Sequence, residues 1–129
     1  MARVLLPVYL VVLFAIVFSP ADDSTPTPGF VGWVVDRLDD LRTSFEPGYV
    51  ALEFTANIAL FVPFGVLVRL AFARPPWWVI LALGFATTVG IELVQSTLPT
   101  RFSTVSDVVA NTLGTAAGLL AARLVRRRG

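Results

Sequence analysis

Four long apolar segments alternate with shorter polar ones along the 129 residues of this chain. They cover about residues 4–19, 50–73, 77–98 and 105–122. A helix needs about 20 mostly apolar residues to cross a bilayer, and these segments are close to that length. Unpaired backbone groups are not tolerated in hydrocarbon, so such segments fold as helices. The sequence therefore predicts an all-α integral membrane protein, a single domain over residues 1–129 with four transmembrane helices.

Composition supports this class and limits the chemistry. Hydrophobic residues make up 56% of the chain and charged residues only 15%, and the mean hydropathy is +0.78. A small soluble domain is far less apolar. The chain has neither cysteine nor histidine, which excludes disulfides, thiol nucleophiles, zinc sites and imidazole catalysis. Carboxylates, arginines, tyrosines and hydroxyls remain for chemistry, and we expect no nucleic-acid partner.

The first apolar segment has two interpretations. Ser19-Pro20-Ala21 loosely resembles a signal-peptidase site, so a cleaved signal peptide stays an alternative. We favour a retained helix, because three more hydrophobic segments follow and Pro7 lies near the helix start, where proline is tolerated. Cleavage would not alter the orientation of the remaining segments.

Residues 20–48 form a polar loop rich in Pro, Asp, Ser and Thr. Apolar residues recur at helical spacing in its middle, at Phe30, Val34, Leu38, Leu41 and Phe45. This spacing predicts a short amphipathic helix on the membrane surface or over the mouth of the bundle. A loop helix that merely packs is the equal alternative.

The arginines predict the orientation in the membrane. One side would carry Arg3, Arg69, Arg74, Arg123, Arg126, Arg127 and Arg128, and the other Arg37, Arg42 and Arg101. Arginine-rich segments stay in the cytoplasm. We therefore expect a multi-pass protein of the cell membrane with both termini cytoplasmic and loop 20–48 extracytoplasmic.

Three of the apolar segments carry an acid followed about one helical turn later by an amide. The pairs are Glu53 with Asn57, Glu92 with Gln95, and Asp107 with Asn111. On the expected topology all three lie toward the outer end of the membrane. Carboxylates and amides are costly in hydrocarbon, so we expect them to face one another rather than lipid. The sequence thus predicts an outward-facing polar pocket.

Small residues share faces with these polar groups. The helical stripes are Asp107, Asn111, Gly114 and Gly118 in the fourth segment, and Gly84, Thr88, Glu92 and Gln95 in the third. Two glycines four residues apart let helices approach closely in membranes. Close-packed helices around one polar cavity would account for both stripes.

These residues also carry a resemblance to a known family. The runs are NIALFVPFG from Asn57, ELVQ from Glu92, Arg101 with Ser103 and Asp107, and NTLG from Asn111. In order and spacing, from about Glu53 to Gly118, they resemble the VanZ-like family. The resemblance implies a small polytopic membrane domain, typified by a protein that gives low-level resistance to the glycopeptide teicoplanin. By motif match its functional positions would be Asn57, Pro63, Gly65, Glu92, Gln95, Arg101, Asp107, Asn111 and Gly114.

Site roles follow from the polar residues. We predict catalytic roles for Glu92, Asp107 and Arg101, and ligand contacts for Glu53, Asn57, Gln95, Ser103 and Asn111. The plainer alternative is an interhelical hydrogen-bond network that only fixes register, at about 0.6 kcal/mol per contact and at most about 1–2. An ionised acid at mid-span costs about 2.5–3.5 kcal/mol, which favours function for Glu92 and Asp107. Arg101 would pair with these acids or bind an anion.

Several function classes stay open from sequence. We favour a VanZ-like protein associated with teicoplanin-type resistance that binds or modifies a membrane lipid or lipid-linked cell-wall precursor at the outer leaflet. An enzyme would use the acids as general acid and base, or to hold Mg²⁺, Mn²⁺ or Ca²⁺, although no metal-binding signature is present. The alternatives are a proton-coupled small transporter, for which so short a chain would need to form a homo-oligomer, and a purely structural membrane partner protein.

Overall fold

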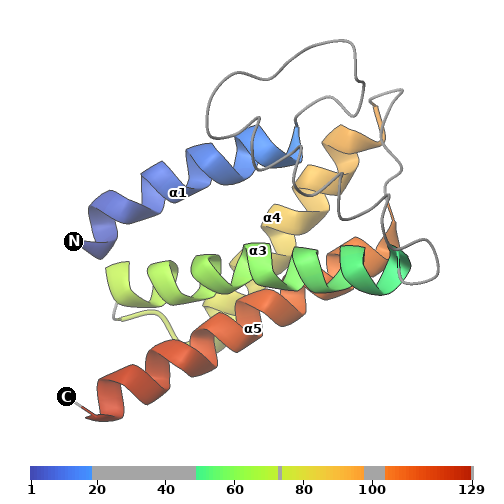
Figure 1. The fold of residues 1–129 in the computed structure, drawn as a ribbon. Coiled ribbons are helices and arrows are strands. Elements are labelled where there is room, and N and C mark those ends of the chain that lie inside the picture. Colours follow the sequence, from blue (N-terminus) through green and yellow to red (C-terminus); the bar gives the residue numbers. More distant parts are fainter. Residues whose placement is uncertain (19–48, 73, 98–103, 129) are drawn as a thin grey trace.

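A computed structural model describes residues 1–18, 49–72, 74–97 and 104–128 of the chain. Its elements are α1 (Ala2–Val17), α3 (Tyr49–Ala71), α4 (Trp77–Gln95) and α5 (Val105–Arg128) (Figure 1). The prediction of an all-α fold is confirmed for these residues. The amphipathic helix predicted within residues 20–48 lies outside the described residues.

Three of the helices are long and apolar enough to cross a membrane. The spans are Glu53–Ala71, Trp77–Gln95 and Val105–Val125. Helix α1 is also apolar, but it has 16 residues. At 1.5 Å per residue it is about 24 Å long, against about 30 Å of hydrocarbon. Within the described residues, the prediction of four transmembrane helices is therefore confirmed for three, and α1 is a shorter apolar helix packed on them.

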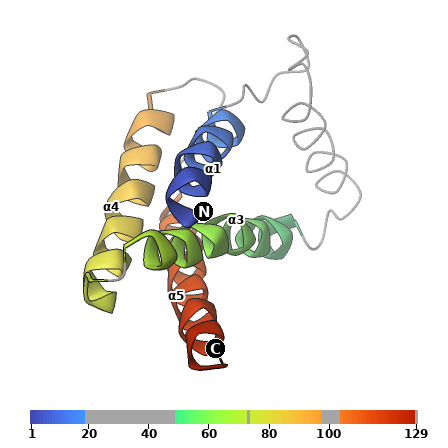
Figure 2. The same cartoon turned by 90° about the vertical axis from the view of Figure 1, so that its left-hand side faces the viewer.

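Helices α3 and α5 form the centre of the bundle. They cross each other and share the most extensive interface, while α1 packs mainly on α3 and α4 mainly on α5 (Figure 2). The buried apolar side chains come from all four helices: Leu13, Phe61, Phe64, Val68, Ile80, Ile91 and Leu119. This shared core packs the four described helices against one another.

Glycines bring the backbones of α3 and α5 into contact. A Cβ atom on Gly118 would overlap the carbonyl oxygen of Val62 and lie 3.0 Å from the Cα of Gly65. A Cβ atom on Gly65 would likewise overlap the carbonyl oxygen of Thr115. Gly114 meets the α3 backbone in the same way one turn earlier on α5. The small-xxx-small contact predicted from sequence is therefore present, and α3 is its partner.

Thr115 joins the third spanning helix to this contact. Its side chain is fully buried and lies against Gly84 of α4, where a Cβ atom would come within 2.5 Å of the threonine Oγ1. The hydroxyl donates a hydrogen bond to the carbonyl oxygen of Asn111, one turn earlier on α5, at 3.1 Å. Helices α3, α4 and α5 therefore meet around Thr115. This contact sets how the polar residues of the three helices line up along the bundle.

Candidate functional site

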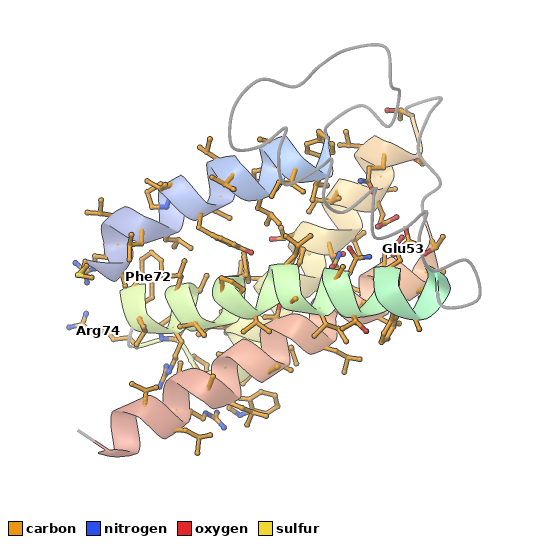
Figure 3. The ribbon with its side chains drawn as sticks, in the orientation of Figure 1. Glu53, Phe72 and Arg74 are labelled. Atoms are coloured by element: carbon orange, nitrogen blue, oxygen red, sulfur yellow. The ribbon has the colours of Figure 1, made fainter. Side chains whose placement is uncertain are left out.

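The described carboxylates gather at one end of the bundle. Glu53 lies in the first turns of α3, Glu92 near the end of α4 and Asp107 in the first turn of α5. Figure 3 shows Glu53 at the end opposite Phe72 and Arg74. We call this the acidic end. It is where the sequence placed the three acid–amide pairs.

Asp107 is hydrogen-bonded through both carboxylate oxygens. Asn57 Nδ2 donates to Oδ1 at 2.6 Å, and Thr104 Oγ1 donates to Oδ2 at 2.8 Å. The Asp107 N–H donates back to Thr104 Oγ1 at 3.3 Å. Thr104 therefore caps the start of α5 through its side-chain oxygen, and an acid in this first turn is also favoured by the helix dipole. Asp107 bonds the capping threonine and ties α5 to α3.

Asn111 and Thr88 form a second polar contact one turn deeper. Asn111 is 5% exposed and Thr88 is fully buried. Asn111 Nδ2 donates to Thr88 Oγ1 at 2.8 Å and so links α5 to α4. Among the described residues, the buried Oδ1 of Asn111 has no hydrogen-bond donor. A buried acceptor without a donor costs about 1–3 kcal/mol, so a donor placed at this atom would stabilise the bundle.

Glu92 and Gln95 lie further along α4 toward the acidic end. Glu92 is one turn beyond Thr88 and is 7% exposed, so its carboxyl group is buried within the bundle. Gln95 Nε2 donates to the carbonyl oxygen of Val17 at 2.9 Å. The Gln95 amide therefore joins the last turn of α4 to the end of α1, a contact that its helical stripe alone does not indicate.

The structure brings some of the predicted site residues together and separates others. Asn57 meets Asp107, whereas Asn111 meets Thr88 on the neighbouring helix. Gln95 contacts the backbone of α1. The side chains of Arg101 and Ser103 lie outside the described residues. Within the part of the chain that the structure describes, no three acidic, histidine or cysteine side chains gather in a way that could hold a metal ion.

Sequence reasoning missed two contacts of this region. Thr104 was not singled out, although a threonine three residues before an acid at a helix start is the ordinary signature of a capping box. Tyr9 of α1 donates to the carbonyl oxygen of Leu60 at 2.6 Å. No sequence signal marks that contact, because it depends on where α1 crosses α3.

The acidic end offers buried acceptor atoms. Glu92 has a buried carboxyl group and Asn111 a buried amide oxygen, and both are acceptors when the acid is ionised. Groups that present O–H or N–H donors would match these acceptors. A phosphate at the same place would be repelled by the carboxylates unless a cation accompanied it.

Comparison with known proteins agrees with the helical and polar pattern. A model of the VanZ/LLP1 protein family matches residues 6–126. No curated protein and no solved structure matches the chain. The matched range runs from α1 to the last turn of α5 and includes every residue of the acidic end. The chain therefore belongs to the VanZ/LLP1 family.

Proposed function

We propose that this VanZ-like protein acts in glycopeptide resistance of the teicoplanin type, by binding the polar head of a membrane lipid or lipid-linked cell-wall glycan in the outer leaflet. The observation that carries the proposal is the buried Oδ1 of Asn111, which has no donor among the described residues. Buried polar atoms in proteins are almost always hydrogen-bonded. This unmatched acceptor favours a ligand that brings its own donor.

The chemistry of the acidic end indicates the class of ligand. Sugar hydroxyls, amide N–H groups and ammonium groups all donate hydrogen bonds, and each would match Asn111 Oδ1 and an ionised Glu92. Lipid-linked cell-wall precursors present hydroxyl and amide donors, and some membrane lipids present an ammonium group. This match supports a donor-rich head group as the ligand.

The distribution of charge supports an outward-facing site. Glu53, Glu92 and Asp107 lie at the acidic end, whereas Arg3, Arg69 and Arg74 lie at the opposite end. Both chain termini are also at that opposite end (Figure 1). Because arginine-rich ends stay in the cytoplasm, this arrangement supports cytoplasmic termini and an acidic end that faces the outer leaflet.

Binding accounts for the described contacts better than catalysis does. Both carboxylate oxygens of Asp107 accept hydrogen bonds from Thr104 and Asn57, which gives this acid a structural role at the start of α5. Glu92 is then the only buried carboxyl group among the described residues. A single acid can orient a ligand, whereas general acid–base chemistry usually needs a partner group.

Substitution of Asn111 by leucine tests the proposal. We expect Asn111→Leu to reduce teicoplanin resistance to the level of cells that lack the protein. The thermal stability of the purified protein should stay within a few degrees of wild type, because the change removes an unmatched buried acceptor together with one hydrogen bond of about 0.6 kcal/mol. Growth in graded teicoplanin and detergent melting curves provide the two readouts.

The matched control is Thr112→Val on the same helix. Thr112 Oγ1 donates to the carbonyl oxygen of Val108 within α5 at 2.7 Å, so the substitution removes a polar group that serves only its own helix. Resistance should persist in this variant. Equal loss of resistance in both variants, or full resistance with Asn111→Leu, would refute a binding role for the Asn111 amide.

A further inference from the structure

A second feature of the bundle, an apolar groove, lies away from the acidic end. It has a volume of about 460 Å³ and runs between α1, α3 and α4. On α1 it is lined by Leu6, Leu10 and Phe14, which follow one another at one-turn spacing. Its one polar lining residue is Thr87, whose hydroxyl donates to the carbonyl oxygen of Leu83 in its own helix at 2.7 Å. The lining therefore suits hydrocarbon and offers nothing to a sugar or an ion.

The groove is open along its side. Phe14 is 39% exposed, Leu83 49% and Phe72 50%, although all three line it. At the acidic end the hydrogen bond from Gln95 to the carbonyl oxygen of Val17 joins α4 to α1.

Arginines surround the other end of the groove. Arg3 Nε donates to the carbonyl oxygen of Ala71 at 3.1 Å, and Arg69 donates through one terminal guanidinium nitrogen to the carbonyl oxygen of Pro75 at 3.0 Å. Pro75 itself lines the groove. Arg74 is exposed beside it, and Figure 3 shows Arg74 at the same end as the lining residue Phe72.

Among the described residues, the charged side chains at the arginine end of the groove are all positive. Glu53, Glu92 and Asp107 are the carboxylates of the described segments, and all three lie at the acidic end. A guanidinium group has five N–H donors, and Arg3 uses only its Nε in the contact with Ala71. Guanidinium groups hydrogen-bond phosphate strongly, and basic pockets between membrane helices bind anionic head groups.

We infer that the groove holds an anionic phospholipid, with one acyl chain along α1 and its phosphate at Arg3 and Arg74. On the expected topology this lipid comes from the cytoplasmic leaflet, which is rich in anionic lipid. The site is separate from the acidic end, because it uses a different end of the bundle and the opposite charge. It would hold α1, the shortest of the four described helices, against the spanning helices.

Lipid titration of the purified protein tests the inference. Phosphatidylglycerol and phosphatidylcholine with identical dioleoyl chains are each added in detergent, and the apparent Kd is taken from the rise in melting temperature. We expect phosphatidylglycerol to bind the wild-type protein more tightly. Arg74→Gln should weaken phosphatidylglycerol binding about fivefold, which corresponds to about 1 kcal/mol per basic residue, and leave phosphatidylcholine unchanged. Arg123→Gln, at an exposed position of α5, should change neither.

A bulky side chain placed in the groove tests whether the lipid binds there. Leu83→Trp should weaken binding of both lipids, whereas Leu113→Trp should not, since Leu113 is equally exposed at 49% but lies on α5 away from the groove. Equal binding of the two lipids to the wild type would overturn the head-group assignment, as would equal effects of the two arginine variants. Equal effects of the two tryptophan variants would overturn the groove as the site. A change of oligomeric state with Leu83→Trp and an unaltered lipid response would show that a second copy occupies it instead.

Discussion

Replacing Gly118 with leucine is expected to prevent α3 and α5 from packing and to remove most of the folded protein from the membrane fraction. The added side chain would enter the space of the Val62 carbonyl oxygen and the Gly65 backbone. Overpacking costs about 1–3 kcal/mol where side chains can move aside, and here the obstacle is backbone. We therefore expect a loss above about 3 kcal/mol, a large share of the 5–15 kcal/mol typical of a folded domain.

The matched control is Gly90→Leu. Gly90 is exposed on α4, and a Cβ atom there has no other atom within 4 Å. This variant should give wild-type yield and melting temperature in detergent, because the new side chain points into open space. A similar loss in both variants would mean that any leucine at a helix glycine is harmful, and a normal Gly118→Leu would refute the close contact of α3 and α5.

Glu92→Gln is expected to abolish teicoplanin resistance while the protein keeps or raises its thermal stability. The carboxyl group is only 7% exposed within a membrane bundle. Replacing an ionised carboxyl group by a neutral amide of the same shape keeps an acceptor oxygen in place and removes a desolvation cost, which is about 2.5–3.5 kcal/mol at the centre of a membrane helix and smaller near its ends. Resistance measurements and detergent melting of the same variant would give the two effects separately.

Asp107→Asn provides a contrast at the same end of the bundle. Asp107 accepts a hydrogen bond from Thr104, the capping residue of α5, and lies in the first turn of that helix, so its neutral replacement should lower stability by about 0.5–1 kcal/mol. Loss of stability and resistance together in Glu92→Gln would identify Glu92 as a structural residue. Full resistance of the Glu92→Gln variant at wild-type stability would show that the Glu92 carboxylate is not needed for function.

Much of the spanning bundle follows from local sequence patterns. Helical phase predicted that Thr88 and Glu92 share one face of α4 and that Asn111 and Gly118 share one face of α5, and all four are buried. The glycine spacing predicted the close contact on α5 because a small residue is needed wherever two backbones touch. These features depend on the spacing of residues within a single helix, and that spacing can be read from the sequence.

Other features depend on how helices cross, which periodicity does not specify. Asn57 meets Asp107 rather than another amide because of the way α3 lies against α5. Gln95 reaches the carbonyl oxygen of Val17, so its place on the polar stripe did not predict its partner. The apolar groove exists because α1 and α4 pack mainly on different helices. No spacing of residues within either helix indicates that separation.

The fourth predicted span is a shorter helix than the other three. The first apolar segment was expected to cross the membrane, and the structure gives it 16 residues, ending at Val17. Arg3 and Tyr9 of α1 bind backbone carbonyl oxygens of α3, which anchors α1 along the bundle. Whether α1 crosses the membrane stays a prediction.

The central claim is that Asn111 Oδ1 receives a donor from a membrane ligand, and a structure of the protein in nanodiscs prepared from native membranes tests it most directly. We expect non-protein density continuous with a lipid or a lipid-linked glycan, with an oxygen or nitrogen donor within about 3.2 Å of Asn111 Oδ1. A side chain of the protein itself in that position, or an isolated water with no connected density, would contradict the claim.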